Sequence, residues 1–158
     1  MTVRTLVAGF GNELRGDDGF GVEVVRELAR RGLDVGARLV EVGTAGLQLV
    51  QHLLDGYDRL IIVDAAARGG SPGSVYVLAV DDVAPSVDAG DMHLAVPSRA
   101  LAMARGVGSL PETIFIVGCE PKHVDDMTTE LSPEVRAGVD RAVGEVRRLI
   151  DGRADDAQ

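Results

Sequence analysis

The sequence predicts an α/β protein: a three-layer α/β/α domain in which helices cover both faces of a mostly parallel sheet of about five strands. Short runs of aliphatic and β-branched residues alternate along the chain with segments whose apolar residues recur at helical spacing. One of these runs, residues 60–63, is apolar at every position, as expected of a central strand that is covered on both faces. Such alternation is typical of helices packed on both sides of a parallel sheet.

Five strands are expected, each bounded by residues that favour turns. Gly9 ends the first strand, Gly43 the second, Asp64 the third and Gly118 the last. The fourth strand follows a break rich in glycine and proline and could lie antiparallel at an edge of the sheet. In chain order, the expected strands cover residues 3–8, 37–42, 60–63, 75–80 and 113–117.

Four helices are expected, at residues 20–31, 44–55, 98–106 and 133–150. Gly32 and Gly56 follow the first two helices, Thr44 can cap the second, and Ser132 followed by Pro133 marks the start of the last. The side chains expected to face the core are Val22, Val25, Leu28 and Ala29, then Leu47, Val50, Leu53 and Leu54, then Leu101, Ala102 and Met103, and finally Val135, Val139, Ala142, Val143, Val146, Leu149 and Ile150.

Length and composition limit the class of protein. With 158 residues, 46% of them apolar and 26% charged, the chain fits one globular domain over residues 1–151, with a polar tail at 152–158 that we expect to fray. The net charge of −9 argues against nucleic acid and anionic membranes as partners. The single cysteine, Cys119, excludes an intrachain disulfide and a Cys-based zinc site. Neither a signal peptide nor a run of transmembrane length is present, so we expect a cytoplasmic protein.

The loop between the first strand and the first helix is rich in glycine and contains two adjacent acids, Asp17 and Asp18. Gly9 and Gly11 match the start of the G-x-G-x-x-G fingerprint of nucleotide-binding proteins, but Leu14 occupies the position of its third glycine. Adjacent carboxylates would also repel a pyrophosphate. The loop therefore fits a cation better than an anion, although either acid could simply cap the following turn.

The predicted topology brings further polar side chains to the same edge of the sheet, because the carboxyl ends of parallel strands lie together and ligands bind beyond them. These side chains are Asp17 and Asp18 after the first strand, Asp64 at the end of the third, His93 after the fourth, and Cys119 and His123 after the last. Two carboxylates and an imidazole suit a divalent metal with open coordination positions.

Each of these residues also has a structural interpretation. Asp64 could cap a turn, and His93 and His123 could be solvated loop residues. Cys119 could be a small core residue at the end of a strand, or a nucleophile paired with one of the two histidines.

Seven short segments, in this order and at this spacing, carry a family resemblance. They are residues 9–12 (GFGN), 17–22 (DDGFGV), 43–47 (GTAGL), 62–65 (IVDA), 92–93 (MH), 118–121 (GCEP) and 131–135 (LSPEV). Through them the chain resembles the [NiFe]-hydrogenase maturation endopeptidases over nearly its whole length. The resemblance implies a cytoplasmic peptidase of α/β/α fold that removes a C-terminal extension from the hydrogenase large-subunit precursor after nickel insertion.

The resemblance also assigns site residues. The family's metal-contacting acid, aspartate and histidine map onto Asp18, Asp64 and His93, which would be both the catalytic residues and the metal ligands, whereas Cys119 is not part of the family's pattern. The nickel is carried by the substrate rather than held permanently. Two mechanisms stay open: activation by nickel, and activation of water by a carboxylate that acts as general base. The alternatives are a non-enzymatic metal-checking or chaperone module for the same large subunit, and a nucleotide-binding α/β protein.

A role of His93 as a metal ligand predicts a pH dependence of activity. An imidazole must be neutral to bind metal, so the processing rate should fall as the pH drops below about 6.5, the ordinary pKa of histidine. The check is the rate of precursor processing on both sides of that pH. A flat profile would count against His93 as a ligand.

Overall fold

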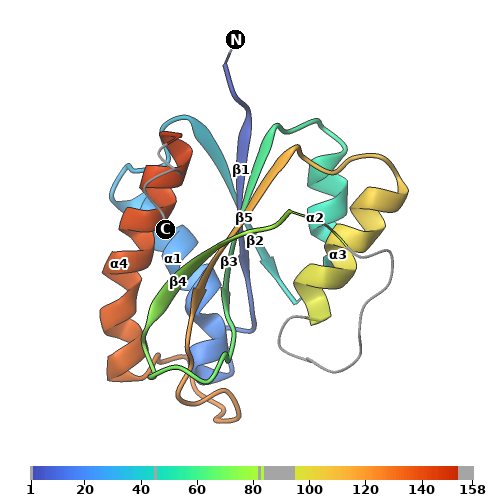
Figure 1. Cartoon of the computed structure of the whole chain (residues 1–158). Helices are drawn as coiled ribbons and strands as arrows, with labels where there is room; N and C mark the ends of the chain where they lie inside the picture. The colour runs from blue at the N-terminus through green and yellow to red at the C-terminus, as the bar shows by residue number, and fades with distance from the viewer. Residues whose placement is uncertain (1, 45, 82, 84–94, 153–158) are drawn as a thin grey trace.

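The computed structural model describes residues 2–44, 46–81, 83 and 95–152. Within these residues five strands form one sheet in the order β2-β1-β3-β5-β4 (Figure 1). The strands are β1 (Thr5–Phe10), β2 (Ala37–Gly43), β3 (Arg59–Ala65), β4 (Val75–Ala79) and β5 (Thr113–Cys119). All pairings are parallel except that of β4 with β5. The predicted fold class and the antiparallel edge strand are confirmed; His93 and residues 153–158 lie outside the described residues.

Helices cover both faces of the sheet, which gives the three predicted layers (Figure 1). The helices are α1 (Phe20–Arg30), α2 (Gly46–Leu53), α3 (Ala95–Gly106) and α4 (Pro133–Ile150), and the short 3-10 helix η1 (Gly16–Gly19) precedes α1. Alternate side chains of β3 enter different cores: Ile61 and Val63 pack with α1 and α4, whereas Leu60 and Ile62 pack with α2 and α3. The continuous apolar run of β3 therefore serves two hydrophobic cores.

The sequence predicted that Gly9 ends the first strand. This prediction is wrong, because β1 continues to Phe10. A Cβ atom on Gly9 would lie 2.5 Å from the carbonyl oxygen of Gly21 in α1. Glycine is needed inside the strand so that the helix backbone can approach it closely.

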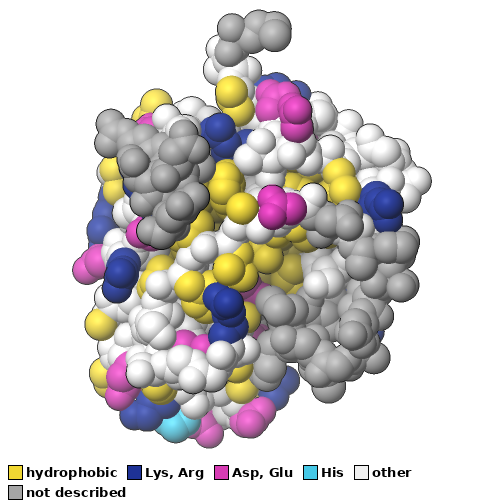
Figure 2. All heavy atoms as spheres, in the orientation of Figure 1, with side chains coloured by type: hydrophobic (Ala, Val, Ile, Leu, Met, Phe, Trp, Pro, Cys, Tyr) yellow, Lys and Arg dark blue, Asp and Glu magenta, His cyan; other side chains and the backbone are white. Residues whose placement is uncertain are grey.

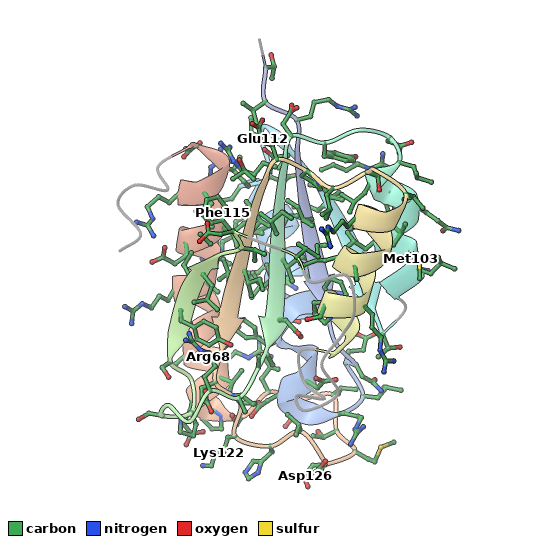
Figure 3. The ribbon with its side chains drawn as sticks, turned by 45° about the vertical axis from the view of Figure 1, so that its right-hand side comes forward. Arg68, Met103, Glu112, Phe115, Lys122 and Asp126 are labelled. Atoms are coloured by element: carbon green, nitrogen blue, oxygen red, sulfur yellow. The ribbon has the colours of Figure 1, made fainter. Side chains whose placement is uncertain are left out.

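The predicted inner face is confirmed for α4, whose seven expected core residues are all buried. Ser132 is its N-cap, with a side chain that accepts a hydrogen bond from the backbone N–H of Val135. For the other helices the predicted face is partly wrong, because Ala29, Leu47, Leu54 and Met103 are exposed. Figure 3 shows Met103 on the outer side of α3. The buried residues of α2 are Leu49, Val50 and Leu53.

The edge strand β4 is only half-buried from Val75 to Leu78. It lies at the front of the molecule in Figure 1, and hydrophobic side chains are visible at the surface in the middle of the same view in Figure 2. None of the described helices is long and apolar enough to cross a membrane.

The close approach of α1 to the sheet predicts a large effect of Gly21→Ala. A Cβ atom there would lie 2.2 Å from the carbonyl oxygen of Val63 and 2.5 Å from that of Phe10, both backbone atoms of strands. We expect the free energy of unfolding to fall by about 3 kcal/mol, because the helix must move away from the sheet. The measurement is urea denaturation.

Gly144→Ala in α4 is the matched control for this substitution. Gly144 is exposed, and nothing lies within 4 Å of a Cβ atom built on it. Alanine should therefore stabilise the protein by about 0.5–1 kcal/mol through its helix propensity. Equal stability of the two variants would contradict the tight packing of α1 on β1 and β3.

Candidate active site

A cavity of about 310 Å³ opens at the carboxyl ends of β1 and β3. Both Asp18 and Asp64 line it, together with Phe10 and Gly11 from the end of β1, Thr44 after β2 and Pro97 of α3. The loop that follows β5 lies at this end of the sheet: Figure 3 shows Lys122 and Asp126 here and Glu112 at the opposite end. Acidic and basic side chains also gather along this lower margin in Figure 2. The carboxyl edge of the sheet is thus both hollow and charged.

Asp64 lies near the end of β3 and is only 4% exposed. Side chains alternate along a strand, so Asp64 points to the same side as Leu60 and Ile62, which pack against α2 and α3. A carboxyl group therefore takes the next position in a row of aliphatic side chains. Burying an acid is costly unless a cation stabilises its charge, so a residue such as Asp64 is a candidate for function.

The surroundings of Asp64 raise its pKa well above the ordinary value. Burial is the main cause, the nearby charge of Asp18 is the second, and a hydrogen bond involving the Ala65 backbone offsets them only in part. Two carboxyl groups that raise each other's energy at the edge of a cavity are an arrangement that a cation would stabilise.

Asp18 lies in η1, where the backbone of the first loop holds it close to the end of β1. Its Oδ2 accepts a hydrogen bond from the backbone N–H of Asn12 at 2.9 Å. The loop passes so close to Gly11 that a Cβ atom there would lie 1.8 Å from the carbonyl oxygen of Asp18, and the φ of Gly11 is +123°. Gly11 also donates to the carbonyl of Gly43 at 2.8 Å, which ties the loop to the end of β2. The half-buried Asp18 side chain is thus oriented by a rigid turn.

Asp17, the neighbouring acid, has a different role. It is fully buried, and its carboxylate accepts hydrogen bonds from the backbone N–H groups of Lys122, His123 and Ser132 and from the hydroxyl of Ser132, at 2.6–2.9 Å. Burial pushes the pKa of Asp17 upward, but these hydrogen bonds outweigh it and lower the pKa below the ordinary value. Asp17 therefore joins the first loop to the loop after β5 and to the start of α4.

Cys119 and His123 take no part in the cavity, since neither is among the described residues that line it. Cys119 is completely buried at the end of β5, in the core formed with α1 and α4, which confirms its interpretation as a core residue. Burial, with smaller contributions from Asp17 and Glu120, raises the pKa of its thiol to about 12, so the reactive thiolate is disfavoured. The side chain of His123 is exposed.

The described residues supply two of the three predicted metal-contacting side chains. Among the described residues, no group of three histidine, cysteine, aspartate or glutamate side chains lies close enough together to hold a metal ion. Asp18 and Asp64 border one cavity, and the third predicted ligand, His93, lies outside the described residues.

Sequence reasoning missed two charged residues of the cavity, Arg15 and Asp125. Arg15 lies between Asn12 and Asp17, in the loop that the sequence already marks as a candidate site, and this position could have identified it as a residue of the cavity. Asp125 follows β5 in a stretch with several charged residues and has no distinguishing sequence feature.

Comparison with known proteins relates this chain to a group of bacterial and archaeal enzymes. A family model described as hydrogenase maturation protease matches residues 22–149, a span that includes Asp64 and begins after Asp18. The hydrogenase expression/formation protein HupD of Rhodobacter capsulatus is 34% identical over 150 residues, which cover 93% of this chain and 71% of HupD.

Solved structures give the same result. The hydrogenase maturating endopeptidase HybD from Escherichia coli has a TM-score of 0.77 at 27% identity, covering 91% of this chain and 90% of HybD. The [NiFe] hydrogenase maturation protease HybD from Thermococcus kodakarensis has a TM-score of 0.77 at 30% identity, covering 94% and 99% of the two chains. The fold and these likenesses define the chain as a peptidase, an enzyme that hydrolyses peptide bonds. It belongs to the hydrogenase maturation protease family.

This membership favours the enzyme over both alternatives raised by the sequence. A peptidase is not a purely metal-checking or chaperone module, and the family match supplies no support for a nucleotide-binding protein.

Proposed function

We propose that this peptidase removes the C-terminal extension of a [NiFe]-hydrogenase large-subunit precursor once nickel has been inserted, and that Asp18, Asp64 and His93 contact the nickel carried by that substrate. One observation carries the proposal: an almost completely buried carboxyl group, Asp64, lines the same cavity as Asp18. Pro97, which follows His93 closely in the sequence, lines this cavity too. The processing of large subunits is supported by the family, and contact with nickel by the donor set.

The electrostatics of the two acids supports a requirement for nickel. Burial and Asp18 raise the pKa of Asp64, so the ionised form of its carboxyl group is less favourable than that of an exposed aspartate. The positive charge of nickel on the incoming precursor stabilises the ionised form of Asp64 and relieves the repulsion between the two acids. A precursor without nickel lacks this interaction, so it is held less firmly.

Cleavage adds water across one peptide bond of the bound extension. The bond between the carbonyl carbon and the nitrogen breaks, hydroxide adds to the carbon, and the new amine takes a proton. Nickel can polarise the carbonyl group, or a carboxylate of the cavity can accept the proton from water. In either case Asp64 and Asp18 act at the edge of the sheet, where the cavity receives the extended peptide.

Intact-mass measurement of the precursor tests the proposal. Purified protein is incubated with nickel-loaded and with nickel-free precursor, and we expect the mass of an extension to be lost only from the nickel-loaded one. An unchanged mass would favour the metal-checking or chaperone alternative. Cleavage that does not depend on nickel would contradict the proposed contact of Asp18, Asp64 and His93 with nickel. Thermal stabilisation by NAD or ATP, but not by nickel, would favour the nucleotide-binding alternative.

A further inference from the structure

Arg15 is the one basic side chain among the described residues that line the cavity. Its positive charge contrasts with the rest of the cavity, because three of the other lining residues, Asp18, Asp64 and Asp125, are acids. The chain as a whole also carries a net charge of −9. An anionic group could approach this end of the sheet only beside a positive charge, and Arg15 supplies one.

The backbone of Arg15 is held firmly. Its N–H donates to the carbonyl of Asn12 at 3.1 Å, and its carbonyl accepts from the N–H of Asp18 at 3.2 Å. Arg15 also forms an isolated parallel bridge with Thr128, next to the hydrogen bond from Gly16 to the Thr128 carbonyl. The backbone that aims the Arg15 side chain therefore belongs to the same rigid turn that aims Asp18.

The side chain of Arg15, by contrast, is held weakly. It is 48% exposed and meets the Oδ1 of Asp125 at 3.2 Å, and Asp125 is itself 90% exposed. An exposed ion pair of this kind contributes little stability. Arg26 shows the difference: Glu13 and Glu41 hold its guanidinium from two sides, at 2.6 and 2.8 Å. Arg26 is thus held by two carboxylates, whereas the exposed guanidinium of Arg15 can exchange Asp125 for another carboxylate.

We propose that Arg15 is a specificity-determining residue that binds a carboxylate of the substrate's C-terminal extension. This inference rests on the proposed function. Asp18 and Asp64 face the nickel, and Arg15 holds a second point of the same substrate at the mouth of the cavity. In the free enzyme Nη2 of Arg15 donates a hydrogen bond to Oδ1 of Asp125 at 3.2 Å, and a substrate carboxylate in that place can accept two parallel hydrogen bonds from the planar guanidinium. The carboxylate is either an acidic side chain of the extension or its C-terminal group.

Steady-state processing of nickel-loaded precursor by the full chain tests this role. Arg15→Gln is expected to raise KM about tenfold with little change in kcat, because it removes a charged hydrogen-bond donor that only the substrate needs. Arg15→Lys should recover part of the loss. Arg30→Gln is the matched control, since Arg30 is also an exposed arginine with a carboxylate partner but does not line the cavity. It should process the precursor like the unmodified enzyme.

Asp125→Asn removes the carboxylate that competes for Arg15. Its KM is expected to fall or stay unchanged, and a rise like that of Arg15→Gln would overturn the proposal. An unchanged KM in Arg15→Gln, or a loss confined to kcat, would overturn it as well. Thermal unfolding of each variant separates a loss of binding from a loss of folding.

Two altered precursors identify the carboxylate. In one, the acidic side chains of the extension are changed to amides; in the other, the extension ends in a carboxamide. For the unmodified enzyme, one of these precursors should show a KM about tenfold higher than that of the original precursor. With the same altered precursor, Arg15→Gln should show no further rise in KM. If neither does so, the inference is wrong. If the unmodified enzyme cuts no precursor at all, the proposed function itself fails, so the two failures can be told apart.

Discussion

Asp64→Asn is expected to reduce precursor processing by roughly a hundredfold or more while the fold is kept. Asparagine has nearly the shape of aspartate, so the row of side chains on β3 between the sheet and α3 stays filled. The substitution removes the negative charge that a divalent cation requires at the buried side of the cavity. The measurement is the rate at which the extension is released, followed by intact mass.

The same variant tests a second prediction, which concerns how the free energy of unfolding depends on pH in metal-free buffer. Because the pKa of Asp64 is raised in the folded state, the folded protein keeps this proton at pH values where the unfolded chain has lost it. The stability of the unmodified protein therefore falls as the pH rises from the ordinary value of 3.8 to the raised folded pKa, and an asparagine side chain has no such dependence. Asp64→Asn should gain stability relative to the unmodified protein across that range and keep the gain above it.

Asp140→Asn is the control for both measurements, because Asp140 is an exposed acid of α4 that pairs with Arg31. It should process the precursor at the normal rate. Full processing by Asp64→Asn would show that the buried carboxylate is not part of the chemistry, and the proposed site would have to be abandoned.

The sheet and its helices could be predicted because their cause is local. The apolar run of β3 and the helical spacing in α4 are visible in the sequence, and Ser132 with Pro133 marks the start of α4. The prediction at Gly9 is wrong because the sequence alone does not distinguish a glycine that ends a strand from one that lets a helix approach it closely. The helical spacing predicts Leu47 and Leu54 inside, but both are exposed, because a short helix offers more apolar positions than the sheet can cover.

The site could be predicted as far as topology determines it. Parallel strands end at one edge, which brought Asp18 and Asp64 together in the prediction, and in the structure both line one cavity. The separate roles of Asp17 and Asp18 could not be predicted, because the partners of Asp17 lie 105 to 115 residues away in the sequence. Arg15 was missed because the direction of a loop side chain depends on contacts such as its bridge to Thr128. The place of His93 stays a prediction.

Asp17→Asn is expected to lower the free energy of unfolding by about 3 kcal/mol, although the substitution replaces only one oxygen with an NH₂ group. Both oxygens of Asp17 accept hydrogen bonds: Oδ1 from the N–H of Ser132, and Oδ2 from the N–H groups of Lys122 and His123 and from the Ser132 hydroxyl. Whichever way the amide turns, its NH₂ group faces a backbone N–H donor in a part-buried hydrogen bond. Urea denaturation measures the loss.

The lowered pKa of Asp17 sets the pH dependence of this loss. Its contribution is present above the ordinary value of 3.8 and is lost as the pH falls through the lower folded pKa. The difference in stability between the unmodified protein and Asp17→Asn should therefore be largest near neutral pH and shrink in strong acid. A difference that grows in acid would contradict the assignment.

Asp18→Asn is the matched variant one residue along the chain, and we expect it to behave in the opposite way. The half-buried Asp18 carboxylate accepts a hydrogen bond from the N–H of Asn12, which an amide oxygen can also accept, so stability should change by less than about 1 kcal/mol. Processing should fall steeply, because the negative charge proposed to contact the nickel is lost. Equal destabilisation by the two variants, or full processing by Asp18→Asn, would contradict this division of roles. The division has a physical basis: the hydrogen bonds of Asp17 hold the turn against the loop after β5, and the fixed turn keeps Asp18 at the cavity.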